Sequence, residues 1–251
     1  MEFEFTGKVA IVTGASSGLG ATTASLLARS GAQVVMTGRD EIRLAGVQKA
    51  AVESGGRAIA VVADLQDDSS FSRITRAAVD AYGLIDVLVH CAALFEMGEV
   101  ETTDTDSIDR MLRVNVRAPM LLTRETIPHL NEQSSIVFVS STGAHLGFAG
   151  RAPYTATKGA IEAFSRSLAV ELAPKTRVNV VAPGFIATPM LTAQCEQAPD
   201  LENWIIEQTP TMFVGTPEDV AASIMMLACA TTSRYVTGST LICDGGWVAK
   251  G

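Results

Sequence analysis

The sequence lacks the features that mark secreted, membrane-spanning and metal-binding proteins. Its four cysteines, Cys91, Cys195, Cys229 and Cys243, are scattered without the spacing of a metal site, so no metal is predicted. They are expected to be reduced thiols in a cytoplasmic protein. No apolar run is long enough to span a bilayer, and the N-terminal residues are acidic where a signal peptide is basic.

Basic charge is also scarce. The formal net charge is -8 and no run of Lys and Arg occurs, so we expect neither nucleic acid nor a membrane as a partner. Apolar residues are abundant instead, at 47% of the chain against 18% charged residues. A chain of 251 residues with this composition supports one large domain with a substantial core.

Short apolar runs alternate with amphipathic segments along the whole chain. The runs predict strands at 8–13, 33–37, 57–62, 85–89, 135–139, 177–181 and 240–243. The segments between them predict helices at 21–29, 40–54, 67–82, 106–130, 156–172 and 217–230. Strands that are apolar on both faces and alternate with helices predict a single-domain α/β fold with a doubly wound parallel sheet.

One stretch, 186–213, interrupts this alternation. It holds several large apolar residues among polar ones, between the last but one strand and a helix. Such an insertion is typical of a lid over a substrate, although an ordinary surface helix explains the pattern equally well.

A glycine-rich turn lies between the first predicted strand and the first helix. It reads Thr13-Gly14-Ala15-Ser16-Ser17-Gly18-Leu19-Gly20. Glycines let the backbone turn sharply and approach a phosphate, which the free N–H groups and the dipole at the start of the helix then hold. Its place between a strand and a helix favours a dinucleotide phosphate site over a plain tight connection.

The end of the second strand indicates which dinucleotide binds. An acidic residue there holds the ribose hydroxyls and favours NAD, but this position is Gly38. Arg39 follows, and its guanidinium suits a 2′-phosphate, so NADP(H) is favoured. In the alternative, NAD(H) binds and Asp40 is the ribose ligand; we interpret Asp40 instead as the N-cap of the second helix.

Tyr154 and Lys158 are the candidate proton-transfer pair. They lie four residues apart at the start of a predicted helix, so their side chains share a face. Tyrosine has a pKa of about 10, and a nearby cation is expected to lower it. Such a pair can give a proton to a carbonyl oxygen or take it from an alcohol. On its own, however, the pattern is common on solvated helices.

Together these motifs resemble the signature of the short-chain dehydrogenase/reductase family. The glycine-rich turn, Asp64-Leu65, Asn115, Ser140-Ser141, Tyr154-x-x-x-Lys158, Pro183-Gly184 and Asp244-Gly245-Gly246 follow one another in the family's order. The chain looks similar to the branch of 3-oxoacyl-carrier-protein reductases. The resemblance implies a Rossmann fold, a homotetramer, and hydride transfer between NADP(H) and a secondary alcohol or ketone without a metal.

The resemblance also implies roles for single residues. Ser141 would hold the substrate oxygen, Tyr154 would transfer the proton, Lys158 would also hold the nicotinamide ribose, and Asn115 would hold a water that links Lys158 to solvent. The cofactor-binding residues are predicted to be Gly14, Ser16, Ser17, Gly18, Leu19, Gly20, Arg39, Asp64, Leu65, Ala92, Tyr154, Lys158, Pro183, Gly184, Ile186 and Thr188. Among them, Asp64 and Leu65 would contact the adenine, and Ile186 and Thr188 the nicotinamide end.

One motif departs from the family. Where the family usually has Asn-Asn-Ala-Gly after the fourth strand, this chain has His90-Cys91-Ala92-Ala93. Ala93 in place of glycine is a small steric change beside the cofactor. His90 cannot copy every hydrogen bond of an asparagine, and we expect it to be a structural residue within the sheet.

The substrate is predicted to contact Ser141, His145, Phe185 and Trp204, with Phe95 and Met97 as further candidates for the pocket wall. His145 could equally be a plain loop histidine. These residues indicate an apolar or aromatic carbonyl compound rather than a free sugar or a strongly anionic molecule. Two alternatives remain on the same fold: a dinucleotide-binding sensor without turnover, against which the intact catalytic residues argue, and an epimerase or dehydratase.

Overall fold

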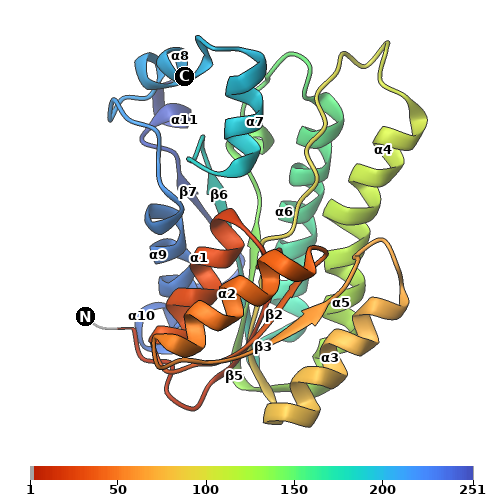
Figure 1. Cartoon of the computed structure of the whole chain (residues 1–251), viewed down its shortest axis with the longest axis vertical. Helices are drawn as coiled ribbons and strands as arrows, with labels where there is room; N and C mark the ends of the chain where they lie inside the picture. Colours follow the sequence, from red (N-terminus) through yellow and green to blue (C-terminus); the bar gives the residue numbers. More distant parts are fainter. Residues whose placement is uncertain (1–2, 251) are drawn as a thin grey trace.

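The computed structural model describes residues 3–250 and contains one seven-stranded sheet (Figure 1). Every pair of neighbouring strands is parallel, and the order across the sheet is β3-β2-β1-β4-β5-β6-β7. The strands are β1 (Val9–Thr13), β2 (Gln33–Gly38), β3 (Arg57–Val62), β4 (Ile85–His90), β5 (Leu130–Val139), β6 (Thr176–Pro183) and β7 (Thr240–Cys243).

Helices cover both faces of the sheet (Figure 1). One face packs against α1 (Gly18–Arg29), α2 (Glu41–Glu53) and α9 (Pro217–Ala228). The other packs against α3 (Ser69–Tyr82), α5 (Ala118–Thr126) and α6 (Ala152–Leu172). Because side chains alternate along a strand, neighbouring residues of β1 enter different cores: Ile11 joins the α3 side and Val12 the α1 side. The predicted doubly wound α/β fold is confirmed.

The direction in which successive strands are added across the sheet reverses between β1 and β4, which lie side by side and parallel in its middle. From β1 the chain winds outward to β2 and β3, and from β4 it winds the other way to β7. In such sheets ligands bind outside the carboxyl ends of the strands at this reversal. The glycine-rich turn that joins β1 to α1 lies there.

The segment predicted as a single helix at 106–130 is divided. Helix α4 (Thr105–Leu112) leads into a π-helical turn, η1 (Arg113–Arg117), then into α5 and a 3-10 turn, η2 (Ile127–His129). Pro128 has no N–H to donate to a carbonyl of the preceding turn, and α5 ends at Thr126, where the 3-10 turn takes over. Strand β5 consequently begins at Leu130, five residues before the predicted start.

The interrupting stretch 186–213 contains two short helices, α7 (Pro189–Gln197) and α8 (Leu201–Gln208). They lie at the same end of the molecule as the C-terminal α11 (Trp247–Lys250) in Figure 1. Short helices η3 (Thr142–Ala144) and α10 (Ala230–Ser233) complete the elements. Among residues 3–250, no helix combines the length and the apolar character needed to cross a membrane.

Candidate active site

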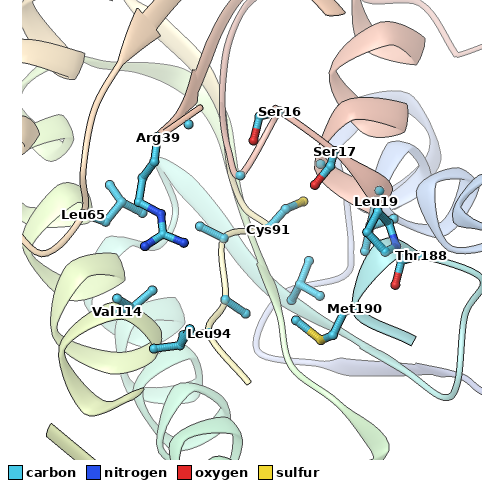
Figure 2. A pocket seen from close by; sticks show the side chains of 18 of the residues that line it. Ser16, Ser17, Leu19, Arg39, Leu65, Cys91, Leu94, Val114, Thr188 and Met190 are labelled. Carbon is cyan, nitrogen blue, oxygen red and sulfur yellow. The ribbon is translucent and has the colours of Figure 1, made fainter. Parts of the chain in front are cut away.

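A cleft of about 330 Å³ lies at the carboxyl ends of the strands. Its lining includes all sixteen of the residues predicted to bind the cofactor, together with Ser141. Figure 2 shows Arg39 and Leu65 at one end of this cleft, Thr188 and Met190 at the other, and Cys91 between them. The topology therefore brings together motifs that are spread from residue 14 to residue 188 in the sequence.

The glycine-rich turn leaves no room for side chains. Gly14 has a positive φ of 69°, and a Cβ there would lie 2.8 Å from the Cα of Ala92. A Cβ on Gly20 would lie 2.3 Å from the carbonyl oxygen of Gly14. Both positions therefore require glycine. The first turn of α1 holds no acidic residue and its N-cap, Ser17, makes no side-chain cap, so the positive end of the helix is open to an anion.

At the end of β2, Asp40 is engaged within its own helix. Its carboxylate accepts a hydrogen bond from the backbone N–H of Arg43 at 2.9 Å and pairs with the Arg43 side chain at 2.6 Å. The predicted N-cap is confirmed. Arg39 is exposed at the rim of the cleft and forms no ion pair with any residue in 3–250. A cation without a protein partner lies where a 2′-phosphate is expected.

Tyr154 and Lys158 rise from the first turns of α6 into the same cleft. The Lys158 ammonium lies 5.5 Å from the centre of the Tyr154 ring and donates a hydrogen bond to the carbonyl of Val139 at 2.9 Å. Ser141, at the end of β5, accepts a hydrogen bond from the N–H of Gly143 at 3.1 Å, which fixes its hydroxyl at the cleft.

Burial dominates the electrostatics of this pair. It raises the pKa of Tyr154 to about 12, with a hydrogen bond from Ser141 and the charge of Arg151 acting in the opposite direction. The prediction that Lys158 lowers this pKa is therefore wrong, since the pKa is raised and the groups that oppose burial are Ser141 and Arg151. Burial lowers the pKa of Lys158 to about 8, because the ammonium loses its water. The phenol stays protonated near neutral pH and is able to donate a proton.

Asn115 lies behind the cleft in the π-helical turn η1 and is 2% exposed. Its Oδ1 accepts a hydrogen bond from the N–H of Leu94, and its Nδ2 donates to the Leu94 carbonyl and to Thr157 Oγ1. The wider turn of the π-helix brings this side chain against both the loop after β4 and helix α6. Asn115 thus joins the cleft wall to the helix that carries Tyr154.

The departure at residues 90–93 falls into two parts. His90 is 4% exposed, stacks on Phe138 at 4.7 Å, and places Nε2 3.0 Å from Thr123 Oγ1. Burial lowers its pKa to about 3, so the ring is neutral, and the predicted structural role is confirmed. Cys91 faces the cleft, but burial raises its thiol pKa to about 12, which leaves it an unreactive thiol.

A second pocket adjoins the cleft and shares Ser141 and Tyr154 with it. Phe95, Phe148 and Phe185 form much of its wall, and of these Phe95 and Phe185 were predicted to line a substrate pocket. Arg151 and Gln194 also line it, and neither was anticipated. The sequence feature that could have pointed to Arg151 is its position three residues before Tyr154, which places it at the N-cap of α6 beside the candidate catalytic residues.

Two residues predicted to contact the substrate do not line either pocket. His145 places Nε2 3.1 Å from Glu162 Oε1, so its ring is held against α6. Trp204 belongs to α8, is 43% exposed and packs against Trp247 with 5.4 Å between ring centres. Met97, a further candidate, is exposed. Trp247, which the sequence did not single out, packs on Phe185 and backs the pocket wall.

Metal ligands do not gather at this site. Within the described part of the chain, no three His, Cys, Asp or Glu side chains come close enough together to hold a metal ion.

Comparisons with known proteins agree with this geometry. A family model described as enoyl-(acyl carrier protein) reductase matches residues 14–248. An NADPH-dependent aldehyde reductase of Arabidopsis thaliana chloroplasts is 38% identical over 97% of this chain and 87% of its own. A short-chain dehydrogenase/reductase structure from Brucella melitensis, described as glucose/ribitol dehydrogenase, superimposes with a TM-score of 0.92 at 33% identity over 98% of this chain and 99% of its own. The chain belongs to the short-chain dehydrogenase/reductase family. An uncharacterized oxidoreductase of Methylorubrum extorquens is likewise 38% identical over 96% of this chain and 97% of its own. Membership of this family makes the protein an oxidoreductase that transfers hydride.

Proposed function

We propose that this protein is an NADP(H)-dependent reductase of ketones and dehydrogenase of secondary alcohols, acting on apolar or aromatic substrates. The observation that carries the proposal is the meeting of Ser141, Tyr154 and Lys158 in the cleft that also contains the glycine-rich turn. A sensor without turnover has no need of that combination, so the site favours catalysis.

The preference for NADP(H) is supported by two features of the cleft. Arg39 reaches its rim without an acidic partner, and Asp40, the rival ligand for a ribose, is already occupied as a helix cap. A guanidinium binds phosphate through two parallel hydrogen bonds. The chloroplast relative is described as NADPH-dependent, which is in keeping with this assignment.

The proposed cofactor would lie between the two ends of the cleft. The turn at Gly14 and the open start of α1 would hold its phosphates, and Lys158 would contact its nicotinamide ribose. When bound, the nicotinamide supplies or accepts the hydride.

The chain's own residues would then bind the substrate oxygen and transfer a proton to it. Ser141 is placed to donate a hydrogen bond to it, and Tyr154 to donate its phenolic proton as negative charge develops there. The ammonium of Lys158, 5.5 Å from the Tyr154 ring, stabilises the phenolate that remains. For alcohol oxidation the same groups act in the reverse order.

The test removes one oxygen atom, that of the Tyr154 hydroxyl. Tyr154→Phe should lower the turnover of aryl and alkyl methyl ketones by about 10²- to 10⁴-fold, the usual contribution of a positioned proton donor. NADPH binding, measured by calorimetry, should stay within about twofold, because the phenol ring remains. Tyr235→Phe is the matched control, since Tyr235 is fully exposed away from both pockets. Activity retained in Tyr154→Phe would refute the proposal.

A further inference from the structure

Arg151 lies in an unusual position for a cation. Its guanidinium carbon is 5.3 Å from the ring centre of Phe95, 5.3 Å from that of Phe148 and 5.1 Å from that of Phe185. These rings hold the charge in place by cation–π attraction and keep water from it. The residue is half-buried in the pocket that adjoins the catalytic serine and tyrosine.

This cation has no anionic partner within residues 3–250. Gln194 of α7 accepts one hydrogen bond from Nη2 at 3.1 Å, and no Asp or Glu pairs with the guanidinium. Aromatic faces do not accept the in-plane N–H bonds that a guanidinium offers along its edges. Burial accordingly lowers the pKa of Arg151, since the charged form has lost water without gaining a carboxylate.

The backbone adds positive charge at the same place. Arg151 is the N-cap of α6, a helix of 21 residues, and no acidic residue lies in its first turn. The positive end of the helix dipole and the guanidinium therefore coincide at the wall of the pocket. Charges that lose their water on burial are stabilised by pairing, and a bound anion would supply the partner that Arg151 lacks.

The pocket connects this charge to the reacting atoms. Phe95 contacts both Arg151 and Tyr154. Its ring lies against the guanidinium of Arg151 and meets the Tyr154 ring edge to face, with 4.9 Å between the ring centres. Ser141 and Tyr154 line both this pocket and the larger cleft. A molecule whose carbonyl rests on these two residues can extend between the phenylalanine rings toward Arg151.

We propose that this pocket selects aromatic ketones, or the corresponding alcohols, that carry a carboxylate on the ring, with the carboxylate bound by Arg151 and the ring by Phe95, Phe148 and Phe185. This rests on the proposed function for the placement of the carbonyl. It also revises the expectation from the sequence, which favoured an aromatic substrate but not an anionic one. The planar guanidinium fits a carboxylate through two parallel hydrogen bonds.

The test compares an acid with its neutral ester. Binding of 3- and 4-acetylbenzoate and of their methyl esters is measured by calorimetry with the enzyme saturated with an oxidised nicotinamide dinucleotide, so that no turnover occurs. At least one acid should bind about tenfold or more tightly than its ester, the usual worth of hydrogen bonds to a charged group. Arg151→Met should abolish this difference and leave ester binding within about twofold.

Two further variants separate charge from packing. Arg151→Lys keeps a positive charge without the planar fork, and should retain only part of the preference for the acid. Arg124→Met is the matched control, because Arg124 is an exposed arginine that pairs with Glu125 and lines neither pocket, and it should change nothing.

The outcomes distinguish this inference from the proposed function. Equal binding of acid and ester, binding of neither, or a preference that survives in Arg151→Met overturns the carboxylate site. If the acids bind through Arg151 but neither acid nor ester is reduced when NADPH or NADH is supplied, the carboxylate site stands and the proposed reaction fails. If the esters are reduced without any preference for the acids, the reaction stands and the carboxylate site fails.

Discussion

The side chain of Asn115 holds the backbone of Leu94 in both directions. Its Oδ1 accepts from the Leu94 N–H at 2.7 Å, and its Nδ2 donates to the Leu94 carbonyl at 2.8 Å. The same Nδ2 donates to Thr157, whose hydroxyl in turn donates to the carbonyl of Tyr154 at 2.6 Å. One amide therefore fixes the cleft wall relative to the helix of the proposed proton donor.

Asn115→Leu should destabilise the protein because it leaves the Leu94 N–H and carbonyl without partners in a buried place. Each buried polar group left unsatisfied costs about 1–3 kcal/mol, so we expect the free energy of unfolding to fall by about 2–4 kcal/mol. Urea unfolding followed by circular dichroism measures this. A decrease in the free energy of unfolding below about 0.5 kcal/mol would show that the Asn115 amide does not stabilise the fold as its hydrogen bonds indicate.

Arg39→Leu should separate the two nicotinamide cofactors. Loss of a guanidinium–phosphate contact should weaken NADPH binding by about 10- to 100-fold and leave NADH within about threefold, as measured by calorimetry. Arg57→Leu is the control, since Arg57 lies at the amino end of β3, whereas the cleft lies at the carboxyl ends of the strands. Equal losses for both cofactors would contradict the assignment and favour the alternative in which Asp40 binds the ribose.

The order of motifs could predict the fold and most of the cleft because both depend on local patterns. Apolar runs of strand length identified the parallel sheet, and a parallel sheet places the residues that follow each strand at one edge. Gly14, Asp64, Ala92 and Ser141 follow four different strands, and they meet in one cleft. Their convergence follows from topology and needs no knowledge of side-chain contacts.

The substrate pocket was less accessible from the sequence because it is built from contacts between loops. Trp204 looked like a pocket residue by its apolar character, yet its partner is Trp247, which is 43 positions away and belongs to the C-terminal helix. His145 is close to Ser141 in sequence but is drawn toward α6 by Glu162. The position of Arg151 before Tyr154 does not reveal its aromatic surroundings, since the three rings around it come from separate loops.

Reduction should slow as the pH rises through the pKa of Lys158. That pKa is lowered to about 8 by burial, whereas Tyr154, at about 12, keeps its proton over the measured range. Below pH 8 the ammonium supports the phenolate that forms when Tyr154 gives up its proton, and above pH 8 the neutral amine does not. We expect kcat/KM for ketone reduction to fall from about pH 8 upward, measured between about pH 6 and 10 with NADPH. A flat profile in this range would exclude this role for the charge of Lys158.

His90 should make the protein sensitive to acid. Burial lowers its folded-state pKa to about 3 from an ordinary value of 6.5, because the ring stacks on Phe138 and has no place for a second proton in the core. Between these two values the unfolded chain binds a proton that the folded protein does not, so unfolding becomes easier as the pH falls from about 6.5 toward 3. One such group changes the free energy of unfolding by up to about 1.4 kcal/mol per pH unit.

His90→Asn removes this titration and restores the residue type usual in the family at that position. The variant should lose less stability than the parent when urea unfolding is repeated at pH 7, 6, 5 and 4, even if it is less stable at pH 7 through the lost stacking. His129→Asn is the control, because His129 is not enclosed in the core. Parallel curves of stability against pH for His90→Asn and the parent would mean that His90 is protonated in the folded state as readily as in the unfolded state. Both ring nitrogens would then carry hydrogen, so Nε2 would donate to Thr123 Oγ1.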